Sequence, residues 1–511
     1  MKLVRTREAL LAGVVHTLVG IPWPALMATA AVAAAFLVGV EYSAFFPAGP
    51  DQSGYVSQAH RWVSGQLRAP LPAWALAQEW TNALVSAAPV GYAIDAANRN
   101  LVPSYAPGLP LAMAVFERIG RADAVFYVVP LFGSIAVWAT YALGKQLAGR
   151  WAGAISAVLL ICSPAFLWML IEPMSDVPAA ACWTVALVFA SRARPGVDGL
   201  LAGLGTAAAI MIRPNLAPLA CFPAVLLLLS STGRTKNIVA FALAAIPAAV
   251  AIALVNANWY GSPLKSGYGS LGTLYAFEHV HVNVRRYLAW LVQTQTPLVF
   301  LWPVAAFIVP ALDLPRRLIL ILIYPLAVLA SYLPYLSFDE WPYLRFLLPA
   351  YPVVLSGLAA VLVTVADRVR PRQLGVSAVA VVTLSLAVHE WMFARDVGTF
   401  RVGTGEARFA HAVALARTLP QNTIFVSDAY SGALHLYTGH DVLRWVMIPE
   451  NNLDVALVSL GRQGYRLYFI GDPFEVERLK REYAHTDAAK RFDARREVVY
   501  AEPFVVADLT P

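Results

Sequence analysis

Charged residues are scarce in this sequence of 511 residues: 14% are Asp, Glu, Lys or Arg, against 59% hydrophobic residues. The mean hydropathy is +0.60, whereas a water-soluble protein carries roughly 25% charged residues. This balance argues against a soluble chain of two or more domains. Because a bilayer offers no water to the backbone, the long apolar runs predict helices of roughly 20 residues that satisfy their own hydrogen bonds.

Cysteine is rare, and familiar nucleotide-binding motifs are absent from the polar tail. The three cysteines, Cys162, Cys182 and Cys221, lie in apolar runs, which argues against a disulfide framework or a thiolate metal site. The tail contains neither a G-x-G-x-x-G nor a Walker A pattern. The formal charge of +7 does not indicate a nucleic-acid partner, because the basic residues fall in short connections where the positive-inside rule accounts for them.

The apolar runs predict a multispanning α-helical membrane protein with about eleven transmembrane helices. The expected spans are 23–43, 123–143, 151–170, 177–191, 199–213, 215–230, 237–255, 297–311, 317–335, 345–365 and 374–393. The first run is long enough to span, so we expect an uncleaved helix there; a cleaved signal peptide is the alternative. Three prolines crowd the first half of 215–230, which favours a broken or tilted helix there.

Short basic connections alternate with longer ones that are richer in Trp, Tyr and Pro. The basic set comprises Lys2/Arg5/Arg7, Lys145/Arg150, Arg192/Arg194, Arg234/Lys236, Arg316/Arg317 and Arg368/Arg370/Arg372. The positive-inside rule makes these cytoplasmic, so we expect a multi-pass protein of the plasma (inner) membrane with a cytoplasmic N-terminus. The other connections, 44–122, 171–176, 256–296 and 336–344, then lie outside, and an odd number of spans places the tail there too.

Two domains are expected: a transmembrane domain over 1–395 and an external domain over 396–511. The first external loop, 44–122, is too polar to span, but "PAWALAQEW" and "GLPLAMAVFERIG" resemble short helices lying along the outer membrane surface. In the tail, strand-like runs such as "TIFVSD" and "YRLYFIG" alternate with amphipathic helical runs. That pattern predicts a small soluble α/β domain with a largely parallel sheet.

Three acids lie where the predicted outer connections meet the membrane. Asp51 follows the first span, and Glu172 and Asp176 lie in the short connection "IEPMSDVP". A carboxylate at an apolar boundary loses hydration and is costly unless it is paired or used. Such acids could deprotonate an acceptor or hold a divalent metal such as Mg²⁺ or Mn²⁺, with Asp51 and Asp176 as ligands. The structural alternative for each acid is a helix cap.

Cationic side chains occur on the same predicted face. Arg345 starts the tenth span, Arg213 ends the fifth, and Lys265 lies in "YGSPLKSGYGS". A guanidinium matches phosphate oxygens in a bidentate way, and an ammonium acts as a point charge. The alternative is snorkelling of these side chains at helix ends. The Gly-, Ser- and Tyr-rich segment around Lys265, which includes Tyr268, is either a mobile flap over a substrate or a flexible connection.

An ordered set of motifs is similar to a known family. "GPDQSGYVSQAHRW", "YAPGLPLAMAVFERIG", "YALGKQLAGRWAGAISAVLLICSPAFLWMLIEPMSDVP", "RPNLAP", "YGSPLKSGY" and "LRFLLPAYPVVL" occur in that order. Over residues 20–365 the chain resembles the GT-C glycosyltransferases of the protein O-mannosyltransferase and aminoarabinose-transferase type, glycosyltransferase family 39. The resemblance implies a cell-envelope glycosyltransferase whose donor is a sugar on a polyprenyl phosphate such as dolichyl or undecaprenyl phosphate.

The resemblance also implies roles for particular residues. Asp51 would orient or deprotonate the acceptor, Asp176 with Glu172 would supply the second acid, and Arg345 would hold the donor phosphate. Further candidates for substrate binding are Arg213, Lys265, Tyr268, Tyr55 and Tyr105. Many relatives have Asp-Glu in the first loop, whereas Gln52 follows Asp51 here, which puts in doubt any role that needs a second carboxylate there.

Other functions fit the same architecture. A ligase or polymerase of lipid-linked glycans would share the outer-face site, but it would need basic residues suited to a pyrophosphate leaving group. A transporter or flippase usually carries ionisable groups or broken helices near the bilayer midplane, whereas the acids here collect at one surface. A non-catalytic scaffold would not need eleven helices. The sequence leaves open the sugar, the acceptor (lipid, protein or polysaccharide), metal dependence, oligomeric state and the role of the tail.

Overall fold

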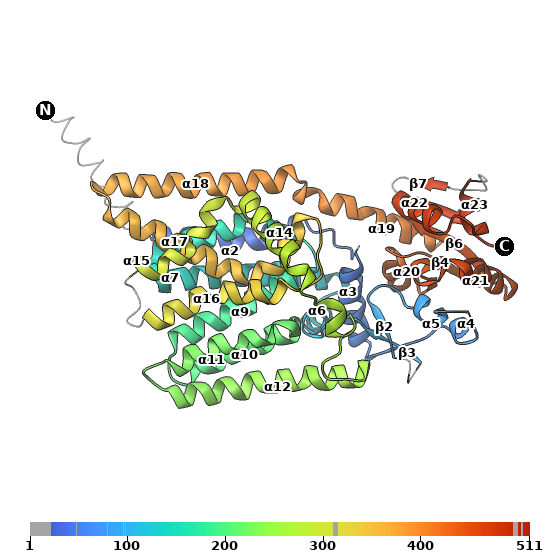
Figure 1. Ribbon diagram of the computed structural model, residues 1–511, viewed down its shortest axis with the longest axis horizontal. Helices are drawn as coiled ribbons and strands as arrows, with labels where there is room; N and C mark the ends of the chain where they lie inside the picture. Colours follow the sequence, from blue (N-terminus) through green and yellow to red (C-terminus); the bar gives the residue numbers. More distant parts are fainter. Residues whose placement is uncertain are drawn as a thin grey trace.

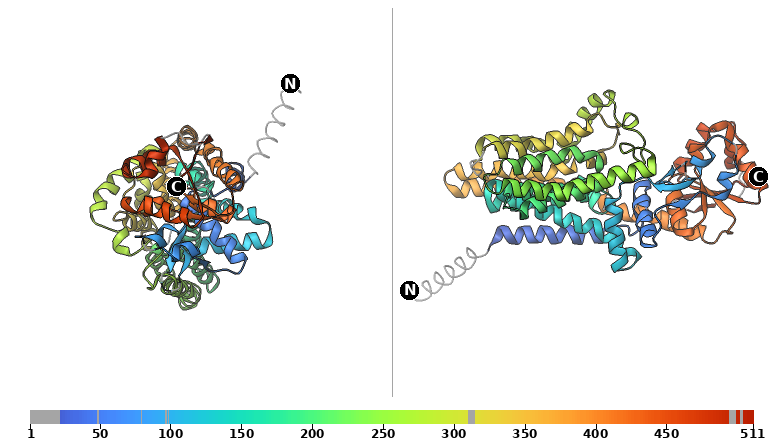
Figure 2. Two further views of the ribbon diagram at one scale, coloured as in Figure 1. Left: turned by 90° about the vertical axis from the view of Figure 1, so that its right-hand side faces the viewer. Right: turned by 90° about the horizontal axis from the view of Figure 1, so that it is seen from below.

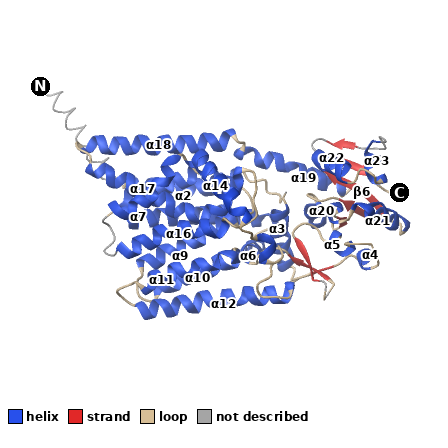
Figure 3. Cartoon of the chain, in the orientation of Figure 1, coloured by secondary structure: helices blue, strands red, loops and turns tan. Residues whose placement is uncertain are grey.

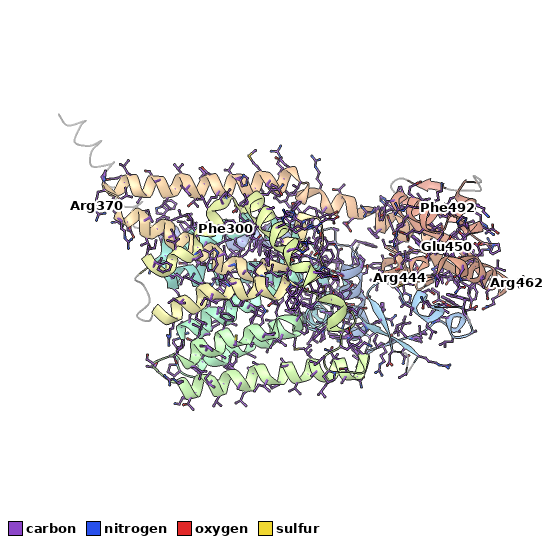
Figure 4. The ribbon with its side chains drawn as sticks, in the orientation of Figure 1. Phe300, Arg370, Arg444, Glu450, Arg462 and Phe492 are labelled. Atoms are coloured by element: carbon purple, nitrogen blue, oxygen red, sulfur yellow. The ribbon has the colours of Figure 1, made fainter. Side chains whose placement is uncertain are left out.

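The chain folds into a long helical bundle with a smaller α/β domain at one end (Figure 1). The computed structural model describes residues 22–511 except 48, 79, 96, 98, 310–314, 494–498 and 502–503. We call the end of the bundle that meets the α/β domain the domain end, and the opposite end the far end. Arg370 lies at the far end, and Arg444, Glu450, Arg462 and Phe492 lie in the α/β domain (Figure 4).

The bundle consists of helices, most of which run along its long axis, as two further views also show (Figure 2). They are α2 (Trp23–Glu41), α7 (Val128–Cys162), α8 (Pro164–Leu170), α9 (Asp176–Arg192), α10 (Val197–Ile212), α11 (Cys221–Leu228), α12 (Arg234–Tyr260), α14 (Glu278–Gln295), α15 (Ala305–Ile308), α16 (Pro315–Tyr332), α17 (Tyr351–Arg368) and α18 (Arg372–Asp396). Four 3-10 segments extend or join them: η1 (Ala122–Tyr127), η2 (Pro214–Ala220), η3 (Pro297–Val304) and η4 (Trp341–Ala350).

The predicted multispanning helical fold is confirmed. Each of the eleven predicted spans coincides, within a few residues at its ends, with helical structure. Within the described residues, 5 helices are long and apolar enough to cross a membrane, or 6 if a bent pair counts as one span. The other predicted spans fall on shorter helices. The expected break in 215–230 is present as η2 followed by α11. The first basic group, Lys2/Arg5/Arg7, lies outside the described residues.

The long helix α7 is a hairpin of two antiparallel helices, which explains why two predicted spans fall on one element. Its helical backbone breaks at Ala148 and Gly149, and Gly149 has a φ of 84° that a residue with a Cβ rarely adopts. Beyond this turn the two arms approach closely, because a Cβ on Gly153 would lie 2.5 Å from the carbonyl oxygen of Tyr141. Small residues allow such close packing between membrane helices.

Two predictions about the outer connections need correction. The connection 256–296 contains the 18-residue helix α14, whose many charged and His residues had concealed its helical character. This helix continues into η3 and α15 after a bend of 99°. The segment "PAWALAQEW" forms only the four-residue helix α4 (Ala73–Leu76), and it does not lie on the membrane surface: Trp74 is buried in a hydrophobic cluster of the α/β domain.

The α/β domain has a five-stranded sheet that is parallel in one half. Its strands are β4 (Thr423–Val426), β5 (Asp441–Leu443), β6 (Arg466–Gly471), β7 (Val499–Ala501) and β8 (Phe504–Asp508), in the order β5-β4-β6-β8-β7. β4 pairs in parallel with β5 and β6, whereas β8 is antiparallel to β6 and β7 to β8. The helices are α19 (Val402–Ala416), α20 (Ser431–Thr438), α21 (Glu450–Arg462), α22 (Pro473–Glu482) and α23 (Asp487–Asp493), joined by η5 (Thr399–Arg401) and η6 (Trp445–Met447).

The first outer loop forms the connection between bundle and domain. It contains α3 (Pro50–Val63), α4, α5 (Ala83–Ser86), α6 (Gly108–Ile119) and a small sheet of β1 (Ala69–Pro70), β3 (Asn100–Pro103) and β2 (Tyr92–Asp95). In the described chain, strands occur only in this loop and in the domain, all at one end of the molecule (Figure 3). Gly432 of α20 packs directly on Ser53 of α3, so the domain is held close to the start of α3.

Candidate functional site

An acid and a guanidinium from distant parts of the chain meet at the domain end. Asp51 lies in the first turn of α3, where the helix dipole stabilises a negative charge. Arg345 lies on η4, and its Nη2 is 3.3 Å from Asp51 Oδ2. The side chain of Arg345 is only 17% exposed and lies over the rings of Tyr343 and Phe346. The two residues therefore occupy one partly water-excluded site, as the sequence predicted.

A second carboxylate–guanidinium pair lies deeper. Arg213, which follows α10, places Nη2 2.5 Å from Asp176 Oδ1, and Asp176 is fully buried at the start of α9. The same guanidinium donates from Nε to Ser175 Oγ and from Nη1 to Tyr332 OH. Asp176 Oδ2 is buried and has no hydrogen-bond partner among the described residues. Arg213 is thus held by three partners, and Asp176 keeps one oxygen available.

Tyrosines connect the two pairs. Tyr55, one turn along α3 from Asp51, donates its hydroxyl to Ser175 Oγ at 3.0 Å. Tyr105 packs against Tyr55 at 4.8 Å between ring centroids and lies close to Asp51. Burial, with the nearby negative charge of Asp51, holds the pKa of Tyr105 well above its usual value, so this phenol stays a hydrogen-bond donor. The predicted binding residues Tyr55 and Tyr105 therefore line the acidic site.

Glu172 is close to the same site and also feels a charge of the α/β domain. Gln52 donates to Glu172 Oε2 at 3.0 Å, so the residue after Asp51, although not an acid itself, is bound to an acid. Burial raises the pKa of Glu172 to about 8, and the carboxylate of Glu406 on α19 contributes to this rise. Glu172 is therefore mostly protonated at neutral pH and can donate as well as accept a hydrogen bond.

The Gly- and Tyr-rich segment after α12 reaches the site with one side chain only. Tyr268 is half exposed and meets Tyr105 edge-on at 5.4 Å between ring centroids. The backbone of Gly267 lies against Ser104, since a Cβ there would be 2.4 Å from a backbone atom of Ser104. Lys265 is exposed and makes no ion pair with a described residue. The structure thus brings Tyr268 to the site, whereas the described contacts of Lys265 do not connect its side chain to the site.

Sequence reasoning missed three residues that shape the site. Ser175 accepts hydrogen bonds from both Tyr55 and Arg213, Tyr332 orients Arg213, and Phe346 stacks on Tyr332 at 5.1 Å between ring centroids. Ser175 and Phe346 both lie inside motifs that the sequence singled out. Tyr332 and Phe346 lie in or beside apolar runs, where hydropathy alone gives no sign of a polar role.

The described residues do not form an evident set of divalent-metal ligands. Asp51 and Asp176 each face a guanidinium, whose positive charge would oppose that of a metal ion. In the described part of the chain no group of three or more His, Cys, Asp or Glu side chains could hold a metal. Dependence on Mg²⁺ or Mn²⁺ stays a prediction, and we derive no chemical step through a metal.

The comparisons with known proteins agree on one class. Residues 104–260 match the sequence model of the family described as Dolichyl-phosphate-mannose-protein mannosyltransferase. This segment contains Tyr105, Glu172, Asp176 and Arg213. Among curated proteins no sequence matches.

Three solved structures have the same fold. ArnT from Cupriavidus metallidurans, bound to undecaprenyl phosphate, superposes with a TM-score of 0.57 at 12% identity, over 96% of this chain and 98% of that one. The oligosaccharyltransferase AglB from Archaeoglobus fulgidus gives 0.52 at 11% identity, over 87% and 69%. The mycobacterial arabinofuranosyltransferase AftD gives 0.52 at 14% identity, over 88% and 35%.

The chain therefore has the fold of the GT-C membrane glycosyltransferases, and the predicted resemblance to that class is confirmed. Within the class, the segment 104–260 is most informative, because there the sequence itself is similar to the dolichyl-phosphate-mannose-protein mannosyltransferases.

Proposed function

We propose that this protein is a membrane glycosyltransferase that moves a sugar from a polyprenyl-phosphate donor to an acceptor at the outer (periplasmic or extracellular) membrane face. The observation that carries the proposal is the meeting of two acid–guanidinium pairs, Asp51–Arg345 and Asp176–Arg213, at one end of an apolar bundle. Two proteins of the same fold are described with a polyprenyl phosphate, ArnT with undecaprenyl phosphate and AglB with dolichol phosphate. A lipid-linked phosphate would bring its charge to this boundary while its chain stays in the membrane.

In the proposed reaction Asp51 is the base. It takes the proton of an acceptor hydroxyl or amine as that atom forms a bond to the anomeric carbon of the donor sugar. The bond from this carbon to the phosphate oxygen breaks, and its electron pair leaves with the polyprenyl phosphate. Arg345 stabilises the developing charge on the phosphate, which is the kind of interaction that contributes most to such catalysis. One direct displacement inverts the configuration at the anomeric carbon.

The two arginines are proposed to have different roles. Arg213 already donates to Asp176, Ser175 and Tyr332, so it is suited to fixing the position of Asp176. Arg345 makes one long contact to Asp51 and has a buried Nε with no hydrogen-bond partner among the described residues. Arg345 is therefore the better phosphate ligand.

We propose the orientation that follows from the positive-inside rule. The far end, where Arg370 lies, carries the short basic connections and would face the cytoplasm. The site and the α/β domain would then lie outside, where lipid-linked sugars are consumed.

Purified protein tested with two classes of donor distinguishes this proposal from the ligase or polymerase alternative. We expect it to consume a sugar linked to polyprenyl monophosphate and to release polyprenyl monophosphate, as measured by mass spectrometry. Consumption of only pyrophosphate-linked glycans would support the ligase alternative, and consumption of neither donor in the presence of cell-envelope acceptors would contradict the proposal.

A further inference from the structure

A cavity of about 370 Å³ lies between the first outer loop and the α/β domain, apart from the acid–guanidinium pairs. One wall comes from α3 and from the segment 69–73, and the other from α20 and the start of β5. Its volume falls in the range of roughly 300–1,000 Å³ that is typical of small-molecule sites. The proposed transfer reaction does not use this cavity.

The polar groups of the cavity are held in fixed positions. Arg61 donates from Nε to Tyr92 OH at 2.8 Å and shares a contact of 3.2 Å between Nη2 and His435 Nε2. Asp441 Oδ2 accepts a hydrogen bond from Trp74 Nε1 at 3.1 Å. Each of these contacts joins side chains that packing already restrains, so little side-chain entropy remains to be lost when a ligand binds.

The charges of the cavity are balanced. Burial, with the nearby Arg61 charge, lowers the pKa of His435 to about 4, so its imidazole is neutral at pH 7. Arg61 then supplies one positive charge and Asp441 one negative charge. Each of these two charges attracts one sign of ligand and repels the other, so the pair gives no net preference for an anion or a cation. A neutral ligand with several hydroxyl groups can form hydrogen bonds to both side chains.

The rest of the lining is small and apolar. It includes Ala69, Pro70, Leu71, Ala87 and Leu101. A sugar ring combines hydroxyl groups at its edge with an apolar face of C–H groups, and this cavity offers partners for both.

From these features we infer that the cavity is a binding site for a neutral sugar residue. Arg61 and Asp51 lie ten residues apart on the continuous helix α3, a separation of about 15 Å along its axis. One sugar residue cannot span that distance, so the cavity is separate from the site of transfer. If the proposed function holds, the cavity binds a more distant residue of a glycan acceptor whose growing end lies at Asp51. Binding energy from such a remote contact can serve the transfer step.

Saturation-transfer NMR on the full-length protein in detergent tests sugar binding without any donor. The probes are mannotriose as a neutral trisaccharide, trigalacturonate as an anionic one and the chitosan trimer as a cationic one. We expect saturation transfer to mannotriose and at least tenfold weaker binding of the charged probes. Asp441→Asn keeps an oxygen for Trp74 but removes the negative charge, so we expect it to improve binding of trigalacturonate at least threefold.

Two further variants at exposed positions of the α4 segment show whether binding occurs in the cavity. Ala73 lines the cavity, so Ala73→Trp should reduce mannotriose binding at least tenfold, whereas Ala77→Trp, outside the lining, should not. Absence of binding by all three probes would overturn the inference, as would equal binding in Ala73→Trp and the unmodified protein. Because no donor is present, either result is independent of whether the protein transfers sugars.

Discussion

Arg345 Nη2 lies 3.3 Å from Asp51 Oδ2 although 294 residues separate them in the chain. The contact is long for a charge-assisted hydrogen bond, and both side chains are only partly buried. A donor phosphate would compete with Asp51 for this guanidinium. Binding of the donor would then free the carboxylate that accepts the acceptor proton, so that the base becomes available only when the sugar is in place.

Replacing Arg345 by Lys should weaken donor binding. Lysine keeps the charge but cannot form the bidentate contact of a guanidinium with phosphate. Loss of one charged hydrogen bond costs roughly 1.5–3 kcal/mol, or about 10- to 160-fold, and we expect that loss in kcat/KM for the lipid-linked sugar. Arg372→Lys at the far end, where the side chain is 78% exposed, is the matched control. An unchanged kcat/KM in Arg345→Lys would contradict the assigned phosphate contact.

The buried pair of Asp176 and Arg213 should matter for stability. Removing one member of a buried ion pair costs about 3–5 kcal/mol, because the other charge stays buried without its partner. Asp176→Asn and Arg213→Gln should each lower the unfolding temperature in detergent, and the double variant should lose less than the sum of the two. The exposed pair Arg372–Asp367, 3.9 Å apart, should show little effect. Additive losses in the double variant would show that the two side chains do not interact.

Glu172 should make stability depend on pH near neutrality. Its pKa is raised in the folded protein from 4.5 to about 8, so the folded state holds its proton more tightly than the unfolded state. The resulting stabilisation is complete below about pH 4.5 and is lost as the pH rises through 8. We expect the unfolding temperature to fall between pH 5 and pH 9, and to fall less in Glu172→Gln. Equal slopes in the two proteins would argue against a raised pKa.

Lys265 should contribute little. It is exposed and makes no ion pair with the described residues, so its charge is screened by water and salt. Lys265→Ala should change kcat/KM for the lipid-linked sugar less than threefold, in contrast to Arg345→Lys. A loss of tenfold or more would show that the segment 261–270 closes over the donor during the reaction.

Hydropathy and the scarcity of acids were enough to predict the bundle and to predict that these residues gather at one end of it. Asp51, Asp176, Arg213 and Arg345 could be placed at one membrane boundary because each lies at or shortly after the end of an apolar run, or directly before the next one. Their pairing could not be predicted, since it depends on how the helices pack. Ser175 and Tyr332 were missed for the same reason.

The errors in the outer connections have a physical cause as well. Helix α14 carries Glu278, His279 and two arginines, so a hydropathy criterion treats it as a loop although it forms a regular amphipathic helix. The segment around Trp74 has the composition of a membrane-surface helix, but its apolar side packs on the α/β domain. The sequence shows that such a face must be buried, but not which surface buries it.

The most direct test of the account is sugar transfer by Asp51→Asn. The amide is close in size to the carboxylate but cannot accept a proton, and loss of a general base typically costs 10²–10⁴-fold. With purified protein, a polyprenyl-monophosphate sugar and a cell-envelope acceptor, we expect polyprenyl phosphate release to fall by at least about 100-fold while the donor still binds. Release at the unmodified rate in this variant would contradict the assignment of Asp51 as the base.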